Sequence, residues 1–574
     1  MAYLKPKKIS GHTYWYVAES RRVGGRVKTV NLAYLGRADD ILRRLLQGNR
    51  LPERLKSFSH GGVAVLLSLA DRLGLVELID RHVQPPRPSR PVRRLLSVGQ
   101  TLVLAAIGRA LHPTSKRGWS AWARQTTWSQ LWRFDPEKIT SAFFWDQMDR
   151  LPAEALTPIQ AELGRRVMDL FDVSADSLFY DVTNFYTFID SRNTHCDLPQ
   201  RGKNKQKRND LRQFQVGMLV SRDGWIPLLA KLYRGNHNDV TTFPQALGAI
   251  RQQCLELHID PRQVTLVADK GNISKKNWQL LDASQIGHVV SLVPSHYKDW
   301  AYCPREQFGT CVVPEIGEVR ALRGQAEVAG QQRTVIVLDS PTLRDGQLRG
   351  LQQQIQPVMW GLSRLRNTLG TAKRRRRRGV IEGQVERILA KRPAVRKLIR
   401  WELTEREDRE GFWTLEWWVS AEAFEFLRDR QYGRRILATD REDWPSEAVI
   451  WAYWGQGEAE LVFRQMKDPE FMALRPQYHW TDQKIEVHSF CCVVGYLLGA
   501  LLRRHARRMG YEQGMSGLLE MLNGVRMVLR TEQSGRPGRP KVHWQLEETD
   551  VDALRLYQSL VHPDYELGPT GKHS

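Results

Sequence analysis

The sequence predicts an α/β protein, and three stretches of the chain support this fold class. Residues 1–55 contain short strand-like runs, residues from about 60 to 170 show helical periodicity, and residues 173–300 alternate strand-like with helix-like segments. A chain of 574 residues is also long enough for about three or four domains. We therefore expect an N-terminal β segment, then a helical region, then an α/β core.

The helical region contains tryptophans among basic residues. VAVLLSLADRLGLVELI and VGQTLVLAAIGRAL repeat apolar residues at i, i+3, i+4 and i+7, which predicts amphipathic helices. The next stretch interleaves two kinds of side chain, namely Lys116, Arg117 and Arg124 with Trp119, Trp122, Trp128 and Trp132. Basic and aromatic helices suit contacts with a DNA backbone, and core packing of the tryptophans is the alternative. Both interpretations stay open.

The α/β region predicts the order β–β–β–α–β–α–β. SLFYDVTNFYTF is a strand candidate, and FQVGMLVSRDGWIPLLAKLYRG predicts two strands that turn at Asp223 and Gly224. A helix is expected to begin near Asn238 to Thr242, where side chains can cap it, and VTLVADKG and HVVSLVP predict two further strands. This is the order of a ribonuclease H-like core, with antiparallel hairpins first and parallel strands after.

An insertion over residues 301–439 is expected to interrupt the core. Strand-like runs such as EVRALRGQAEV, RTVIVLD and FWTLEWWV surround a helical, basic middle. A block of like charge is usually a solvated face, whereas beside a nucleic-acid groove it contacts phosphates. The block consists of Arg374, Arg375, Arg376, Arg377 and Arg378.

The core is expected to resume after the insertion with two helices. VIWAYWGQGEAELVFRQMK has helical texture, and a second helix is expected over 484–505. The apolar run from Phe490 to Leu502 is shorter than the roughly 20 residues of a membrane span, so we expect a buried helix. The expected parts of the chain are 1–55, 56–172, 173–300, 301–439, 440–510 and a C-terminal helical segment, 511–574.

The composition favours a nucleic-acid partner. The chain has 86 Lys and Arg against 63 Asp and Glu, a formal net charge of +23, and 41% hydrophobic residues. That apolar fraction excludes a disordered polycation, and the charge indicates a polyanionic partner. Six cysteines without zinc-type spacing, and an N-terminus without an apolar signal sequence, favour a cytosolic protein with no membrane partner.

Two aspartates follow or occupy predicted strands. Asp181 lies inside the otherwise apolar SLFYDVTNF, where an unpaired carboxylate is costly. Asp269 ends the strand VTLVADKG, at the end of a strand where α/β proteins bind ligands. The structural alternatives are a satisfied strand-end aspartate and a turn aspartate before Gly271.

Glu460 is a third acidic candidate, placed by helical geometry. At about 100° per residue, Tyr453 and Lys467 lie seven residues either side of Glu460 and about 20° from it, and Gln456 lies about 40° away. One polar stripe would therefore hold all four residues on a continuous helix. The alternative is a surface helix with a Glu460–Arg464 pair, which contributes only tenths of a kcal/mol.

Taken together, these motifs resemble the DDE transposases of bacterial insertion sequences. DVTNF, LVADKG and Y-x₂-Q-x₃-E-x₆-K, with FRQMK and RPQYHW, are similar to the insertion-sequence-four superfamily, the branch with a Tyr-Arg-Glu-Lys signature. YVAESRRVGGR…LAYLG and RGNHNDVTT also resemble that branch, so the similarity covers most of the chain. Gln456 departs from it, because the family has Arg there.

The resemblance implies a catalytic and metal-binding triad of Asp181, Asp269 and Glu460. The family also places a β-rich insertion before the Glu helix, where the texture of 301–439 already predicts one. Carboxylate oxygens suit Mg²⁺, and two such ions promote in-line displacement at phosphorus, with Mn²⁺ as a substitute. The DNA-binding candidates are Tyr453, Gln456, Arg464 and Lys467, together with the arginine block.

The expected function is that of a cut-and-paste DNA transposase. It would bind terminal inverted repeats of double-stranded DNA, cleave them by metal-assisted hydrolysis and join the 3′-OH ends to target DNA. A homodimer is expected when two ends are synapsed, and the expected location is the bacterial cytoplasm, with the nucleoid. The alternatives are a catalytically inactive DNA-binding protein descended from such an enzyme, and a ribonuclease H-like nuclease without strand transfer.

Overall fold

The computed structural model describes residues 2–23, 26–48, 54–84, 96–190, 192–202, 208–237, 239–268, 274–472, 474, 477–532 and 541–566. The chain forms two compact units. One consists of residues 1–68, 120–136 and 520–574, and the other of residues 69–119 and 137–519. Each unit has its own sheets and its own buried side chains.

The first unit contains two small antiparallel sheets. β1 (Ala2–Ile9), β2 (His12–Val23) and β3 (Arg26–Gly36) form one sheet, which confirms the strand-like runs at the N-terminus. The other has the order β17-β16-β4, so the segment after residue 511, expected to be helical, also contributes strands. These strands are β4 (Arg54–Ser59), β16 (Arg526–Glu532) and β17 (Lys541–Leu546).

Buried aromatic and histidine side chains form the interior of this unit. Trp122 and Trp128 pack edge to face with ring centres 5.6 Å apart, and both are buried. His60 bonds to Thr127 Oγ1 at 2.8 Å and to Tyr557 Oη at 2.9 Å. For these two tryptophans the core interpretation therefore holds. The helices that bear or flank these residues are α5 (Trp119–Gln125), α6 (Trp128–Leu131), α20 (Val551–Leu560) and α21 (Pro563–Glu566), and α1 (Ala38–Gly48) packs against β2 and β3.

The second unit is built on a nine-stranded mixed sheet of order β10-β11-β12-β15-β9-β8-β5-β6-β7. β5, β6 and β7 are antiparallel neighbours, β8 runs parallel to β5, and β9 runs parallel to β8. α9 (Asp239–Glu256) connects β7 to β8, and α10 (Lys275–Ser284) connects β8 to β9. The expected order β–β–β–α–β–α–β is therefore observed. The strands are β5 (Ser177–Tyr186), β6 (Gln213–Ser221), β7 (Pro227–Arg234), β8 (Thr265–Ala268) and β9 (Gly287–Leu292).

Part of the expected insertion extends this same sheet. β10 (Gly309–Val313), β11 (Gly317–Val328), β12 (Gln331–Asp339) and β15 (Arg434–Thr439) continue it in antiparallel fashion from β9. Only the chain between β12 and β15 leaves the sheet. We call this part, residues 340–433, the excursion.

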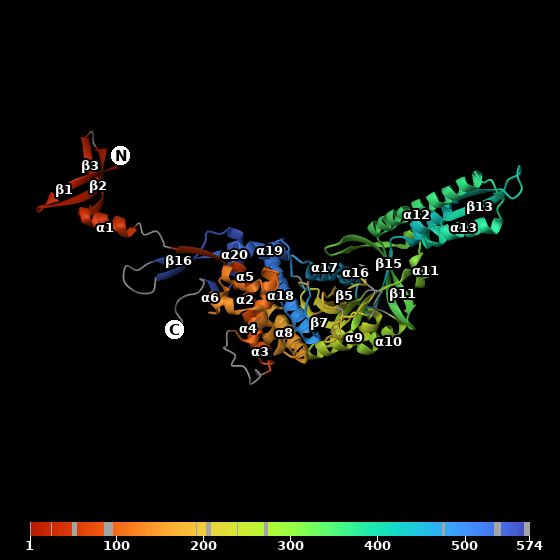
Figure 1. Cartoon of the computed structure of the whole chain (residues 1–574), viewed down its shortest axis with the longest axis horizontal. Helices are drawn as coiled ribbons and strands as arrows, with labels where there is room; N and C mark the ends of the chain where they lie inside the picture. Colours follow the sequence, from red (N-terminus) through yellow and green to blue (C-terminus); the bar gives the residue numbers. More distant parts are fainter. Residues whose placement is uncertain are drawn as a thin grey trace. The chain divides into compact units, whose positions relative to one another are not determined.

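The excursion has a hydrophobic core of its own. α12 (Pro341–Gly370) packs against α13 (Arg378–Ala390) and against the hairpin of β13 (Ile399–Glu405) and β14 (Trp413–Val419) (Figure 1). Leu362, Val385 and Leu415 are fully buried in this core. The excursion also contains α14 (Pro393–Arg396) and α15 (Ala421–Phe426). It is thus a helical and hairpin module rather than a purely β-rich one.

Buried helices pack beside the sheet in the second unit. α18 (Asp482–Arg508) packs against α4 (Val98–Leu111) and against β7. Among the described residues, α18 is the one helix long and apolar enough to cross a membrane, and 94% of its most apolar 18-residue window is buried inside the protein. This agrees with the buried helix expected around Phe490 to Leu502. The other helices are α2 (Gly61–Arg72), α3 (Leu75–Asp80), α7 (Ser141–Asp149), α8 (Leu156–Phe171), α11 (Lys298–Ala301) and α19 (Met515–Asn523).

Candidate catalytic site on strand β5 and helix α17

Asp181 lies in the middle of β5, the strand between β6 and β8. It pairs with Met218 of β6 and is half-buried, whereas the strand positions before it are buried. Alternate residues of a strand point to the same face, so Asp181 shares a face with Phe179 and Thr183. The β-branched and aromatic neighbours favour the strand, and the carboxylate is the exception within it.

α17 (Gln456–Lys467) packs along this strand. At its beginning, Gly455 lies against the ring of Phe179, and an added methyl group there would come within 2.8 Å of Trp225. At its end, Lys467 Nζ donates a hydrogen bond to Thr183 Oγ1 and lies 5.5 Å from the ring centre of Phe185. Both ends of α17 therefore rest on β5.

Glu460 lies on α17 between these two anchors. Gly455 to Lys467 rises about 18 Å at 1.5 Å per residue, and Phe179 to Phe185 spans about 20 Å of strand. Glu460 is seven residues before Lys467, which is about 20° around the helix from a side chain that contacts β5. Asp181 lies between the two anchors on the strand. The structure thus packs the helix that bears Glu460 along the strand that bears Asp181, and Glu460 itself is exposed.

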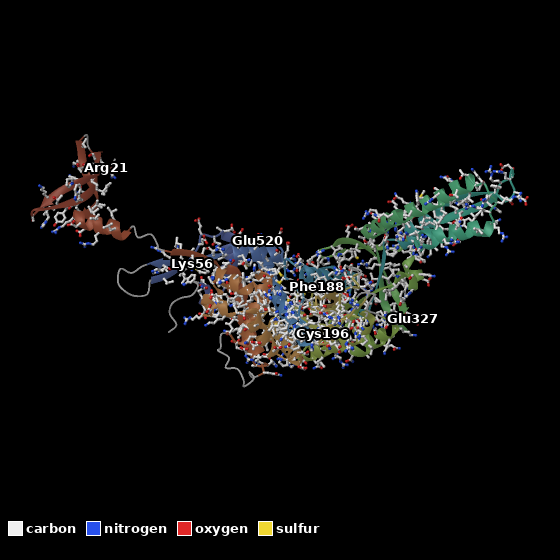
Figure 2. All side chains as sticks on the ribbon, in the orientation of Figure 1. Arg21, Lys56, Phe188, Cys196, Glu327 and Glu520 are labelled. Carbon is white, nitrogen blue, oxygen red and sulfur yellow. The ribbon has the colours of Figure 1, made fainter. Side chains whose placement is uncertain are left out.

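The two segments that leave β5 and α17 also meet. The backbone N–H of Phe188, two residues after β5, donates to the carbonyl of Gln477 at 2.9 Å. Thr187 and Gln477 form an isolated parallel bridge, and Figure 2 labels Phe188 in this region. The strand and the helix are therefore joined a second time beyond Lys467.

Tyr453 is not on the same helix as Glu460. The sequence stripe assumed one continuous helix, but α16 (Ser446–Trp454) ends before Gly455 and α17 begins after it. Tyr453 is 5% exposed, and the guanidinium of Arg435 lies 5.2 Å from its ring centre. The stripe is therefore divided, with Tyr453 in the interior and Glu460 and Lys467 on α17.

Three candidates on α17 and β8 remain. Gln456 is the first residue of α17, but its side chain lies outside the described residues. Arg464 is exposed. Asp269 also lies outside the described residues, because β8 ends at Ala268 and the next described residue is Ser274.

The two described carboxylates, those of Asp181 and Glu460, are oxygen ligands of the kind that a hard metal ion binds. Among the described residues no group of three or more His, Cys, Asp or Glu side chains gathers in one place, and Asp269 is not among them. Glu460 is exposed and Asp181 is half-buried, so both carboxylates can reach solvent. Carboxylate oxygens of this kind suit Mg²⁺ together with water and phosphate oxygens.

The arginine block lies in the turn between α12 and α13 of the excursion. The backbone of Arg376 is fixed, because its N–H donates to Gly411 O at 3.0 Å and its carbonyl accepts from Trp413 Nε1 at 2.9 Å. Arg375 pairs with Glu410 at 3.7 Å. At the end of the block, Arg378 pairs with Glu382 at 2.8 Å, and Arg374 and Arg377 are exposed. The block is held to a hairpin while most of its guanidinium groups face solvent.

Two residues that position α17 were missed by the sequence reasoning. Arg222, in the β6–β7 turn, donates to the carbonyl of Trp451 and contacts that of Ala452 at 3.5 Å, so it caps the C-terminal end of α16. Burial lowers the pKa of Arg222 to about 10. Gly455 is the other, and a glycine inside a helical pattern was the available signal.

Comparisons with known proteins give little further information. No protein-family model matches the chain, and no curated protein matches it. Its fold is similar to a solved structure described as the cryo-EM structure of piggyBac transposase synaptic complex with hairpin DNA. The two share 8% sequence identity and a TM-score of 0.34, over 81% of this chain and 80% of that chain. A similarity with this identity and TM-score does not identify the function of this chain.

Proposed function

We propose that this protein is a DNA transposase that uses divalent metal ions for phosphoryl transfer. The observation that carries the proposal is the placement of α17 along β5, with Lys467 bonded to Thr183 at one end and Gly455 against Phe179 at the other. A helix with Glu460 that packs along a strand with Asp181, in a protein of net charge +23, suits metal-assisted chemistry on a polyanion.

The strand order supports a ribonuclease H-like core. Five neighbouring strands have the order β7-β6-β5-β8-β9, in which the first three are antiparallel and the last two are parallel to β5. This is the arrangement expected from the sequence. Asp181 lies on the strand at its centre.

Asp269 is proposed as the third carboxylate. The described parallel register pairs Phe179 of β5 with Val267 of β8. Asp181 and Asp269 each follow that pair by two residues in the sequence. Carboxylates that each follow a paired position of neighbouring parallel strands by two residues are suited to share metal ions.

In the proposed mechanism, Asp181, Asp269 and Glu460 hold two Mg²⁺ ions, for which Mn²⁺ can substitute. When bound, the ions supply activation of the attacking oxygen and stabilisation of the leaving oxygen. Lys467 fixes the helix against Thr183 and places a positive charge beside the carboxylates, where a phosphate has to approach. No side chain has to become a covalent nucleophile, because water would displace the 3′-oxygen from a phosphorus at the element end. The 3′-OH released in this step would then displace the 3′-oxygen from a phosphorus of the target strand.

DNA binding is assigned to the exposed basic groups. Arg464, Lys467 and the arginine block would contact phosphates. Gln456 is neutral, so it would supply no positive charge at the position where the resembled family has Arg. Phosphate contacts hold the duplex without reading its sequence. The proposed substrate is a pair of inverted-repeat ends and a target duplex, the proposed assembly is a homodimer on paired ends, and the proposed location is the bacterial cytoplasm.

The test is a cleavage and joining assay with the element ends, found by selection from DNA that flanks the coding sequence. Asp181→Asn, Asp269→Asn and Glu460→Gln are expected to lower cleavage at least 10³-fold and to leave end binding within about threefold, because loss of one metal ligand removes most of the electrostatic stabilisation. Glu470→Gln, an exposed glutamate just after α17, is the matched control.

The outcomes separate the possible functions. Cleavage that survives in all three variants contradicts the triad. Binding without any cleavage by the wild-type protein indicates the inactive DNA-binding protein. Cleavage without joining indicates a nuclease that lacks strand transfer.

A further inference from the structure

A pocket of about 630 Å³ lies where β5 begins, away from the proposed catalytic carboxylates. Its walls come from the segment that leads into β5, the turn between β6 and β7, and the C-terminal turns of α18. Asp181 is four residues beyond Ser177, the first residue of β5, which is about 13 Å along a strand. Five guanidinium groups line the pocket, those of Arg222, Arg503, Arg504, Arg507 and Arg508.

Arg504 forms a rigid wall of the pocket. It is 8% exposed and donates to Asp223 Oδ1 at 2.7 Å, to the carbonyl of Phe171 at 2.7 Å and to that of Asp172 at 2.6 Å. Burial alone would raise the pKa of Asp223, but hydrogen bonds from Arg504 and from the N–H of Ser174 lower it. Asp223 is therefore the charge partner of Arg504.

Arg222 and Arg503 make their described hydrogen bonds to backbone carbonyls. Arg503 is 5% exposed and donates to Gly224 O at 3.0 Å. Arg222 donates to Trp451 O, and its guanidinium lies 3.0 Å from the centre of the Trp451 ring. Carbonyl oxygens and an aromatic face orient these guanidinium groups, and the carboxylate of Glu315 acts on the charge of Arg222.

The charge balance of the pocket is positive. Its lining contains the five arginines and three carboxylates, those of Asp176, Asp223 and Glu315, which leaves an excess of two positive charges. The C-terminal end of α18 contributes roughly half a negative charge, which offsets only part of that excess. Arg507 and Arg508 are exposed at the rim, one helical turn after Arg503 and Arg504. An anion that enters the pocket therefore meets guanidinium groups both at the rim and in the wall.

We propose that this pocket binds phosphate groups, at a site distinct from the catalytic carboxylates. Guanidinium groups match phosphate oxygens in pairs of parallel hydrogen bonds, and their planar shape suits partly buried sites better than an ammonium does. The volume accommodates one or two phosphates with water. The phosphates come from a free polyphosphate or from a second stretch of DNA backbone, and a competition experiment separates these sources.

The probe is inorganic pyrophosphate, titrated into the full-length protein by calorimetry, with tryptophan fluorescence as a second readout because Trp225 and Trp451 line the pocket. Arg507→Gln with Arg508→Gln is the main variant, since exposed residues at a helix end tolerate substitution. We expect it to weaken pyrophosphate binding at least tenfold. Arg222→Gln is a second variant in the wall. Lys391→Gln with Arg392→Gln, two exposed basic residues after α13, is the matched control.

Each result decides the proposal. No saturable pyrophosphate binding by the wild-type protein overturns it, and so does equal weakening in the rim and control variants. If pyrophosphate binds and competes with a duplex of arbitrary sequence, the pocket holds DNA backbone. If it binds without competition, the pocket holds a small anion. None of these results depends on DNA cleavage, so the catalytic proposal and this one can fail separately.

Discussion

The ammonium group of Lys467 donates a hydrogen bond to Thr183 Oγ1, which fixes the last turn of α17 to the strand that bears Asp181. The two residues are 284 positions apart in the chain. Their contact joins a helix after the excursion to a strand before it. It keeps the helix that bears Glu460 against the strand that bears Asp181, as the proposed site requires.

Removal of this contact is expected to weaken cleavage more than folding. Lys467→Met and Thr183→Val should each lower cleavage at least tenfold, because the last turn of α17 then loses its hydrogen bond to β5. In a double-mutant cycle the two changes should be coupled by about 1–2 kcal/mol, in the range for contacting residues. Lys467→Arg, which keeps the charge, is the control. Additive effects of the two substitutions would show that the contact does not position the helix.

Gly455, which precedes α17, and Gly457, which lies in its first turn, offer a matched pair. A methyl group at Gly455 would meet Phe179, Arg222 and Trp225. A methyl group at Gly457 would have no other atom within 4 Å among the described residues. Gly455→Ala is expected to cost about 1–3 kcal/mol by overpacking and to lower cleavage. Gly457→Ala should stabilise the protein by about 0.4–1 kcal/mol, because it restricts the unfolded chain.

Thermal unfolding and cleavage assays of both variants measure this difference. We expect the melting temperature to fall in Gly455→Ala and to rise in Gly457→Ala. A loss of similar size in both variants would mean that the helix tolerates no alanine near its start, and the packing of Gly455 on Phe179 would not be the cause.

Neutralisation of the arginine block is expected to flatten the salt dependence of DNA binding. Arg374→Gln, Arg375→Gln and Arg377→Gln together should reduce the slope of log K against log salt by about 0.9 for each phosphate that is no longer neutralised. Arg262→Gln, whose guanidinium pairs with Asp260 at 2.8 Å, is the control. Binding measured between about 50 and 200 mM salt, in the range where such contacts are strongly screened, tests this. An unchanged slope in the triple variant would place the DNA elsewhere.

Buried histidines are expected to make stability fall as the pH falls. Burial lowers the pKa of His60 to about 4, and burial lowers the pKa values of His479 and His488 well below their ordinary value. Below about pH 6.5 the unfolded chain binds protons that the folded chain does not, so each such histidine costs about 1.4 kcal/mol per pH unit. The stability is therefore complete above that pH and is lost progressively toward about pH 4.

Melting temperatures measured between about pH 7 and pH 5 test this effect, because the ordinary pKa of histidine lies within this range. His60→Gln should reduce the pH slope of the transition that belongs to the first unit, where His60 bonds to Thr127 and Tyr557. His12→Gln, at an exposed position, is the control. A pH slope that is the same in the His60 variant and in the wild type would contradict the assignment.

Local sequence was sufficient to predict those strands and helices that depend on side-chain alternation and on turn residues. The strand around Asp181, the turn at Asp223 and Gly224, and the helix after Asn238 all follow from such signals, because neighbouring residues alone determine them. The break at Gly455 was not predicted, since the apolar pattern continues across it. It arises from packing of Gly455 on Phe179, a residue 276 positions earlier in the chain.

Sequence by itself determined the charge excess, the element order β–β–β–α–β–α–β and the acidic candidates, because these depend on composition and on short-range periodicity. Only the tertiary structure decided which elements that bear the candidates pack together. It placed Glu460 and Lys467 along β5 and buried Tyr453 against Arg435. It also joined β10, β11, β12 and β15 to the main sheet, although the sequence assigned them to an insertion. The physical reason is that strand pairing and helix docking are set by burial between segments hundreds of residues apart, which no local pattern records.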